Sequence, residues 1–243
     1  MRIWGITHRG SVRTENQDAF QFIIPENGSS LGVVCDGMGG AKGGKTASRV
    51  AVRVFMDCLR PELQKELDET QLRAFLEKGV QTANAAVYER GKENPLLHGM
   101  GTTMVAAALL PDRAVILNVG DSRAYHLTGG TLARVTNDHS LVEDMVSHGK
   151  LTREEAKHHP QKNLITRALG AEQSVVCDLF SVALAPGDYL LLCSDGLSNL
   201  ISEEELLEIV SQGGAPNICC DKLLQTALSR GAPDNVTVVL FQI

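Results

Sequence analysis

The sequence predicts an α+β fold in which antiparallel sheets pack against separate layers of helices. Strand-like segments come in pairs joined by short turns, such as the pair that flanks Gly129-Gly130, a good two-residue hairpin signal. Helical segments are grouped together instead of alternating singly with strands. A parallel sheet built from βαβ units would need that alternation, so the pattern favours antiparallel sheets.

The first half of the chain carries three strand patterns followed by two helical ones. Turn-forming residues from Pro25 to Ser30 separate the second strand from a short, wholly apolar third strand. Apolar positions then recur at helical spacing. The expected strands are 2–8, 18–24 and 31–35, and the expected helices are 44–59 and 70–90.

The second half returns to strands and ends in one. Its first two strands meet at Pro111-Asp112, and a later pair meets at Pro186-Gly187-Asp188. A polar segment at 138–168 is expected to be helical. The expected strands are 102–110, 113–119, 122–128, 131–136, 174–183, 188–193 and 235–243, and the expected helices are 202–212 and 217–229.

Composition excludes several classes of function. The 243 residues carry a net charge of −6 with basic residues spread along the chain, which argues against nucleic acid as a partner. No apolar stretch is long enough for a membrane span and no signal peptide is visible, so we expect a cytoplasmic protein that does not use a membrane. Six scattered cysteines without a CxxC motif are expected to be reduced, buried thiols.

Carboxylates recur at the ends of apolar strands. Asp36, Asp121 and Asp195 each follow an apolar run and precede glycine or serine, and Asp234 opens the final strand. One Asp-Gly alone is most often a turn. Several that converge on one sheet edge would repel one another unless a cation lay among them. Without a nearby cysteine or histidine pair, the pattern predicts a hard divalent cation with oxygen ligands.

Eight short motifs, in order, resemble the bacterial type 2C metal-dependent serine/threonine protein phosphatases. Each motif is weak alone, but their order over residues 5–243 is highly specific. The motifs are Arg13–Asp18, Asp36–Gly40, Gly99–Thr103, Gly120–Tyr125, Asp138–Leu141, Ile165–Gly170, Ser194–Leu197 and Asp234–Thr237.

The resemblance implies a four-layer α-β-β-α sandwich with two central antiparallel sheets and a small flap subdomain at about 138–168. A single catalytic domain would cover 1–243. The implied activity is hydrolysis of phosphoserine and phosphothreonine by a metal-activated water, without a phosphoenzyme. The implied partners are phosphorylated proteins and a cognate serine/threonine kinase.

The resemblance also assigns metal ligands by position. Asp36 would bridge two ions, and Gly37 would offer its backbone carbonyl to one of them. Asp195 and Asp234 would bind the other ion, and Asp18 would help to hold the site, partly through water. The implied ions are Mn²⁺ or Mg²⁺, both of which take oxygen ligands.

Two further residues have implied roles in the same site. Asp121 matches the acidic residue of a third, weaker metal site, and Arg13 matches the residue that grips the substrate phosphate. The fork of donors on a guanidinium suits phosphate oxygens. His139 lies in another of the motifs and is expected to orient its loop, while Arg123 and Arg167 are expected to pair with carboxylates.

The chain departs from the family pattern at two positions. Ala41 stands where many members have a histidine that protonates the leaving alcohol, and Lys45 stands where glutamate is common. Without a positioned general acid, the rate for a poor leaving group falls by roughly 10²–10⁴. We therefore expect the acidity of the leaving group to limit the rate.

Three other classes of protein match parts of the sequence pattern or the same chemistry. The segment Gly39–Thr46 satisfies the phosphate-binding pattern G-x-x-x-x-G-K-[ST], but an NTPase of that type needs a parallel sheet. A cysteine phosphatase needs arginine six positions after a cysteine, and none of the six cysteines has one. A pseudophosphatase that only binds phosphoproteins would predict lost aspartates, and all the expected ones are present.

Overall fold

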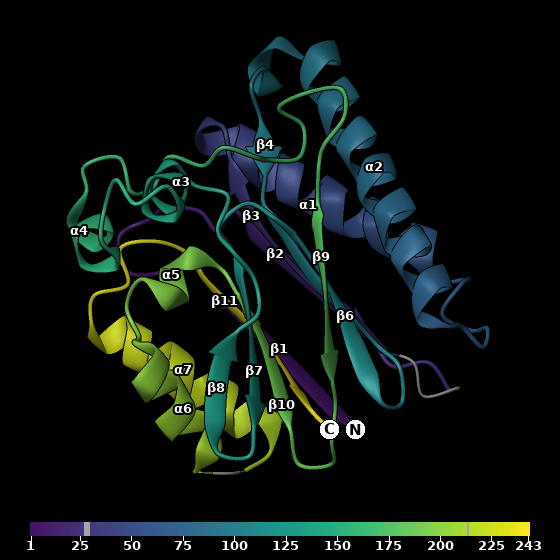
Figure 1. Cartoon of the computed structure of the whole chain (residues 1–243). Coiled ribbons are helices and arrows are strands. Elements are labelled where there is room, and N and C mark those ends of the chain that lie inside the picture. Colours follow the sequence, from purple (N-terminus) through teal and green to yellow (C-terminus); the bar gives the residue numbers. More distant parts are fainter. Residues whose placement is uncertain (27–29, 213) are drawn as a thin grey trace.

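Two antiparallel sheets form the centre of the fold in the computed structural model, which describes residues 1–26, 30–212 and 214–243 (Figure 1). The first sheet has the order β1 (Arg2–His8), β11 (Val236–Gln242), β10 (Tyr189–Cys193), β7 (Arg123–Thr128) and β8 (Thr131–Arg134). The second has the order β2 (Asp18–Ile23), β3 (Ser30–Met38), β5 (Met104–Leu109), β6 (Arg113–Val119) and β9 (Asp178–Ala183), with β4 (Gly101–Thr102) paired to β3. Every pairing between these strands is antiparallel, as the sequence predicted.

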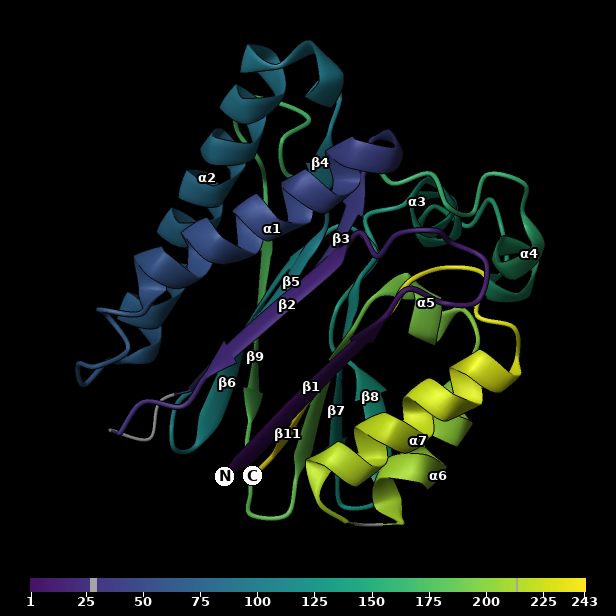
Figure 2. The ribbon, with the colours of Figure 1, turned by 180° about the vertical axis from the view of Figure 1, so that it is seen from behind.

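Helices cover the outer face of each sheet (Figures 1 and 2). The second sheet is covered by α1 (Gly40–Leu59) and α2 (Glu69–Glu93), and the first by α5 (Asp195–Ser198), α6 (Glu203–Ser211) and α7 (Pro216–Ser229). Two short helices, α3 (Leu141–Ser147) and α4 (Arg153–His158), lie at one end of the sandwich beside α5. A single 3₁₀ turn, η1 (Pro95–Leu97), follows α2.

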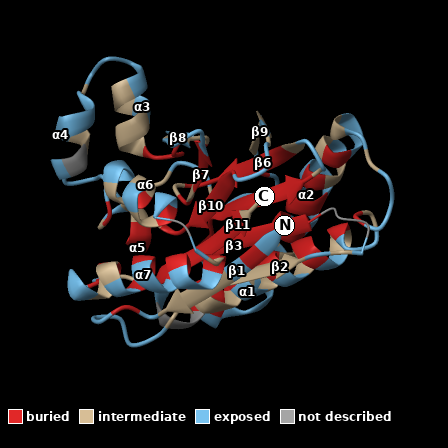
Figure 3. Cartoon of the chain, turned by 90° about the horizontal axis from the view of Figure 1, so that it is seen from below, coloured by how far each residue is buried: buried red, intermediate tan, exposed pale blue. Residues whose placement is uncertain are grey.

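The apolar core divides into three layers, which accounts for the four layers of secondary structure. One cluster lies between the second sheet and α1–α2, and includes Val33, Phe55 and Leu76. Another lies between the first sheet and α6–α7, and includes Leu223. A third lies between the two sheets and includes Phe241. Figure 3 shows these buried strands between helices whose outer faces are exposed. The predicted four-layer α-β-β-α sandwich is confirmed.

Local sequence signals fix several element boundaries. The N-termini of α2, α4 and α6 are each closed by a reciprocal capping box, in which the cap side chain and the residue three positions later satisfy each other's backbone N–H. The hairpin β7–β8 turns at Gly129 and Gly130, with φ of 55° and 78°. Positive φ at both central residues defines the turn type that the sequence predicted.

The structure corrects several predicted boundaries, three of which differ most. Segment 138–168 is not one helical region, because Gly149, with φ of 68°, separates α3 from α4 and Pro160 follows α4. Helix α1 begins at Gly40 instead of 44, since its glycine-rich first turn has no apolar periodicity. The strand predicted at 174–183 begins at Asp178. Part of the predicted turn at 25–30 lies outside the described residues.

The cysteines and the helices agree with what the composition predicts. All six cysteines are free, and Cys35, Cys193, Cys219 and Cys220 are buried, as expected for packed thiols. None of the helices in the described residues combines the length and the apolar character that crossing a membrane requires.

Glu69 joins the first turn of α2 to two strands of the second sheet. Its carboxylate accepts hydrogen bonds from Ser181 on β9, from Arg113 on β6 at 2.8 Å and from Arg73 at 3.0 Å. These bonds, with that of Ser181 the largest contribution, lower the pKa of Glu69 to about 2. A carboxylate whose pKa is lowered by folding stabilises the fold above its unfolded pKa, and that contribution is lost as pH falls toward the folded pKa.

We therefore predict that Glu69→Gln destabilises the protein at pH 7 and that the difference from wild type shrinks as pH falls from about 5 toward 3. Urea unfolding midpoints of both proteins across this range measure the effect. Glu93→Gln, an exposed carboxylate at the other end of α2, is the matched control and should show no such trend. A Glu69→Gln difference that stays constant with pH would contradict this account.

Candidate metal centre

Acidic side chains from five separate segments gather at one end of the sandwich. Asp18 on β2 lies directly opposite Asp36 on β3 in the antiparallel register. Asp195 is the first residue of α5, directly after β10, and Asp234 lies two residues before β11. Asp121 follows β6. The expected convergence of strand-end carboxylates is therefore present.

A cleft of about 490 Å³ opens at this end of the molecule. It brings together six of the seven residues that the sequence singled out: Arg13, Asp36, Gly37, Asp121, Asp195 and Asp234. The seventh, Asp18, is buried behind the cleft wall. Asn163 and Ile165, from the segment after α4, line the cleft as well; Ile165 begins one of the sequence motifs, but neither residue was predicted to belong to the site.

Asp18 ties the two sheets together beneath the cleft. Its Oδ2 accepts hydrogen bonds from the hydroxyls of Ser194, directly after β10, at 2.8 Å and of Thr237, on β11, at 2.6 Å. Burial raises the pKa of Asp18 to about 6, an effect that these two hydrogen bonds oppose. Its Oδ1 has no hydrogen-bond partner among the described residues, although it is buried. A buried, unpaired carboxylate oxygen fits a site that a cation or its water would complete.

Asp36 is held through its backbone by Thr103. The Thr103 N–H donates to the Asp36 carbonyl at 2.8 Å, and the Asp36 N–H donates to Thr103 Oγ1 at 2.9 Å. The same hydroxyl lies 2.8 Å from the hydroxyl of Ser122. These bonds fix the direction in which the Asp36 side chain leaves the strand. Thr103 lies in one of the sequence motifs, but this role could not be predicted from it.

The electrostatic environment disfavours several charges at once. Burial raises the pKa of Asp36 well above its ordinary value, and the neighbouring carboxylates of Asp18, Asp195, Asp121 and Asp234 raise it further. Burial, then the charge of Asp195, raises the pKa of Asp121 to about 7. The pKa of Asp195 is raised by burial and then by the charge of Asp234. A bound cation would reverse these shifts, because opposite charge favours the ionised form.

The donor set fits hard divalent ions. No histidine or cysteine is among the described residues that line the cleft, which argues against zinc. Within the described ranges, the acidic side chains do not close into a complete group of three or more ligands. An open set of carboxylates suits ions that keep several waters, as Mg²⁺ does. Oδ1 of Asp195, like that of Asp18, is buried and lacks a partner in the described part of the chain.

Arg13 lies at the mouth of the cleft and contacts a candidate ligand. Its Nη2 donates to Asp234 Oδ2 at 2.8 Å, and Asp234 Oδ1 accepts from the backbone N–H of Asn235 at 2.8 Å. The hydrogen bond from Arg13 to Asp234 is the largest cause of the raised pKa of this guanidinium. A guanidinium has five N–H donors, so this bond leaves others that can reach a phosphate.

Asn235 organises the loop that carries Arg13. Its amide nitrogen donates to the carbonyls of Arg9 and Glu15 at 2.9 and 3.0 Å, and its amide oxygen accepts from the Gln17 N–H at 2.7 Å. One side chain therefore fixes a loop that is more than 200 residues away in sequence. Sequence analysis placed Asn235 in a motif but gave it no role.

Glycines allow the backbone of α1 to pack closely against that of β3, beside the candidate ligand Asp36. A Cβ on Gly37 would lie 2.0 Å from the carbonyl oxygen of Gly44, and a Cβ on Gly44 would lie 2.5 Å from the carbonyl oxygen of Gly37. The start of α1 therefore rests directly on the end of β3, which explains the glycines around the Asp36 motif. Ala41 lies in α1, and its side chain falls outside what the structure describes, so the expectation about the leaving group stays a prediction.

The phosphate-binding pattern at Gly39–Thr46 does form a strand-to-helix connection, from β3 to α1. However, both neighbours of β3, which are β2 and β5, pair with it in antiparallel fashion. Lys45 lies 3.6 Å from Glu15, in an ion pair at the surface. The parallel sheet of a P-loop fold is therefore absent around β3, and the NTPase interpretation is excluded.

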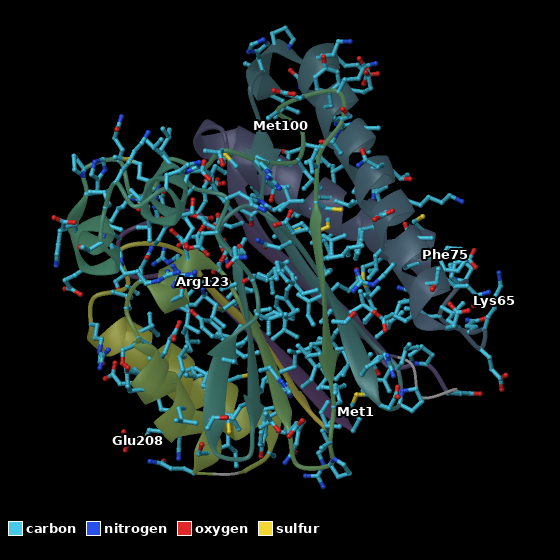
Figure 4. The ribbon with its side chains drawn as sticks, viewed as in Figure 1. Met1, Lys65, Phe75, Met100, Arg123 and Glu208 are labelled. Carbon is cyan, nitrogen blue, oxygen red and sulfur yellow. The ribbon has the colours of Figure 1, made fainter. Side chains whose placement is uncertain are left out.

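The ion pairs expected of two arginines are confirmed. Arg123, at the end of the sandwich near α5 (Figure 4), donates through Nε and Nη2 to both carboxylate oxygens of Asp138. Arg167 donates to Asp178 at 2.9 Å. Both arginines join the ends of segment 138–168 to the sheets.

Comparisons with known proteins agree with this geometry. Residues 5–219 match the sequence profile of the family described as "Protein phosphatase 2C". The serine/threonine phosphatase stp of Listeria welshimeri is 38% identical over 236 residues, covering 97% of this chain and 93% of the relative. The solved serine/threonine phosphatase of S. agalactiae superposes with a TM-score of 0.92 at 34% identity, covering 100% of this chain and 99% of that structure. The catalytic domain of the phosphatase PstP, solved in complex with two manganese ions, gives a TM-score of 0.85 at 34% identity over 98% of this chain and 96% of that structure.

Fold, cleft and relatives together define a phosphatase of a metal-dependent class. The chain belongs to the protein phosphatase 2C family, whose members depend on metal. The predicted enzyme class, a protein phosphatase, is confirmed.

We predict that Asp36→Asn stabilises the metal-free protein, because it removes one buried charge from a group of like charges. A gain of about 1 kcal/mol would raise the Tm by roughly 2–4 °C in a protein of this size. The same variant should no longer gain stability from Mn²⁺, since binding only to the folded state is what raises the Tm.

Thermal unfolding with EDTA and with Mn²⁺ tests both parts. Asp57→Asn, an exposed carboxylate on α1, is the matched control and should behave as wild type. An equal Mn²⁺-induced rise in wild type and Asp36→Asn would show that the ion binds elsewhere.

Proposed function

We propose that this chain removes phosphate from phosphoserine and phosphothreonine residues of proteins by direct attack of water at a two-ion centre. The observation that carries the proposal is the gathering of Asp36, Asp195 and Asp234 around one cleft, where Oδ1 of Asp195 is buried and has no partner in the described part of the chain. The similarity to serine/threonine phosphatases over nearly the whole chain supports it.

Each residue has a role that follows from its place. Asp36 would share its carboxylate between the two ions, and the Gly37 carbonyl and the Asp195 and Asp234 carboxylates would supply further ligands, since all four residues line the same cleft. Asp18 supports this arrangement from behind through its bonds to the other sheet. When bound, divalent ions supply water of lowered pKa and polarise the phosphoryl oxygens.

The protein itself binds the phosphate and offers no nucleophile. Arg13 at the cleft mouth can donate to the phosphate oxygens and stabilise the charge that develops on them. Thr103 also lines the cleft, but its hydroxyl is committed to the Asp36 N–H and to Ser122. No base activates it, so a covalent phosphoenzyme is not expected.

The finer features of the proposal follow the family resemblance. The two ions would be Mn²⁺ or Mg²⁺, and Asp121 would contribute to a third, weaker site on the cleft wall. Residues 1–243 would form one catalytic domain, with 138–168 as a flap that supplies Asn163 and Ile165 to the cleft. The partners would be cytoplasmic phosphoproteins and a serine/threonine kinase that phosphorylates them.

A phosphoprotein-binding pseudoenzyme remains the alternative class. It would be expected to have lost acidic residues, whereas all five aspartates of the predicted set lie at or directly behind the cleft. The absence of the histidine at Ala41 is the one feature in its favour. Catalysis is therefore the property to measure.

We predict that the purified protein hydrolyses p-nitrophenyl phosphate and a phosphothreonine peptide only when Mn²⁺ or Mg²⁺ is present, and that EDTA abolishes both activities. Asp195→Asn should lower kcat on the order of 10²-fold or more, because several kcal/mol of transition-state charge stabilisation depend on the ions. Asp57→Asn again serves as the control and should keep full activity. Binding of the phosphopeptide without any hydrolysis, under either metal, would favour the pseudoenzyme.

A further inference from the structure

His139 contacts both polar backbone groups of Gly120. The His139 N–H donates to the Gly120 carbonyl at 2.9 Å, and the Gly120 N–H donates to the ring Nδ1 of His139 at 3.1 Å. His139 is buried, with 6% of its surface exposed, and it is not among the residues that line the cleft. It therefore acts on the site only through the residues that it holds.

The residue that His139 holds is next to a cleft residue. Gly120 directly precedes Asp121. Gly120 has φ of 103°, and a Cβ there would lie 2.6 Å from Cγ2 of Thr103, the residue that holds Asp36. Gly120 is thus packed between Thr103 and His139. Because its bond to Nδ1 is buried, water cannot replace the acceptor if the ring nitrogen is removed.

The other side of His139 contacts the segment that forms the second cleft wall. Its carbonyl accepts from the Thr166 N–H at 2.8 Å, and the next residue, Ser140, pairs with Ile165 in an isolated β-bridge. Ile165 lines the cleft opposite the residues of the sheets. One residue therefore joins the backbone beside Asp121 to the backbone beside Ile165.

The contacts also fix the proton on the imidazole. Because Nδ1 accepts a hydrogen bond from Gly120, the proton of the neutral ring is on Nε2. Nε2 then donates to Asp178 Oδ2 at 3.1 Å, and Asp178 Oδ1 accepts from Arg167 at 2.9 Å. Arg167 Nη1 lies 3.2 Å from Nε2, but both nitrogens carry protons, so Asp178 is the acceptor for both.

We propose that His139 is a positioning residue that fixes the position of Asp121 relative to Ile165 on the other side of the cleft. The hydrogen bond that Nδ1 of His139 accepts from the Gly120 N–H is the contact responsible. The proposal rests on the proposed phosphatase function. It assigns the Asp178 contact a lesser part, which is to hold the ring tautomer and its orientation.

Two substitutions separate the two ring nitrogens. Asn places an amide oxygen close to the position of Nδ1, so His139→Asn keeps an acceptor for Gly120 and loses the contact with Asp178. Gln reaches the position of Nε2, so His139→Gln keeps a partner for Asp178 and leaves the Gly120 N–H without an acceptor. Asp178→Asn is the matched control, because it weakens the Asp178 contact while leaving His139 in place.

The measurements are kcat and KM on a phosphothreonine peptide with saturating Mn²⁺, and amide hydrogen exchange of segments 119–122 and 163–167. We expect His139→Gln to lower kcat/KM by about 10–100-fold, the usual range for residues that orient a metal site through a neighbour. Exchange at Gly120 and Asp121 should accelerate in the same variant. His139→Asn and Asp178→Asn should keep a rate close to wild type and slow exchange at Gly120.

The two His139 variants give different results if the Gly120 contact matters and equal results if it does not. Equal losses in His139→Asn and His139→Gln, or full activity in His139→Gln, would overturn the proposal. If His139→Gln does not fold, the protection of Gly120 in His139→Asn decides the question, since its loss would overturn the proposal and its retention would support it. Wild type that lacks phosphatase activity would refute the proposed function, while the exchange pattern would still report on the His139–Gly120 bond.

Discussion

Repulsion among buried carboxylates is the constraint on which the site depends. Asp18 and Asp36 face each other across two neighbouring strands, a pairing of like charges that weakens a sheet. Asp195 and Asp234 come to the same place from the other sheet. Without a bound cation, other interactions must hold these carboxylates close together. Hydrogen bonds around the aspartates provide them.

The supporting contacts share one design. Asp18 is bound by two hydroxyls from the opposite side of the sandwich. Both backbone groups of Asp36 are bound by the N–H and hydroxyl of Thr103, and both of Gly120 by the N–H and ring Nδ1 of His139. The Asp18 bonds cross between the two sheets, whereas the bonds to Asp36 and Gly120 come from neighbouring segments, so sheet packing and loop position together set the geometry of the cleft. Preorganisation of this kind is how a metal-dependent hydrolase keeps charged groups in place without spending binding energy on their arrangement.

The rim of the cleft is built differently from its floor. The floor is formed by residues at the ends of buried strands. In contrast, α3 and α4 contribute no fully buried residue in the described part of the chain. Segment 138–168 is attached mainly through polar contacts at its ends, those of Arg123, His139 and Arg167. The floor of the cleft therefore depends on the packing of the sheets, whereas the rim depends on a small number of polar contacts.

Much of this could be predicted from the sequence. Hairpin signals such as Gly129-Gly130 gave the antiparallel sheets, and the strand-end aspartates gave the place of the site, because both depend on local patterns. The partners of those aspartates could not be predicted. Asp18 meets Thr237 across 219 residues of sequence, and nothing local to either residue indicates the contact. The region 138–168 was misjudged because its polar composition fits a surface helix, while Gly149 and Pro160 divide it.

We interpret this cluster of carboxylates as a site for divalent ions. Titration of the metal-free protein with Mn²⁺, following free Mn²⁺ by electron paramagnetic resonance and proton release by pH, tests it most directly. The account predicts at least two bound ions per chain, with protons released near neutral pH because the carboxyl groups must ionise to bind. Absence of binding up to about 1 mM Mn²⁺, well above the range of tight oxygen-ligand sites, would contradict it.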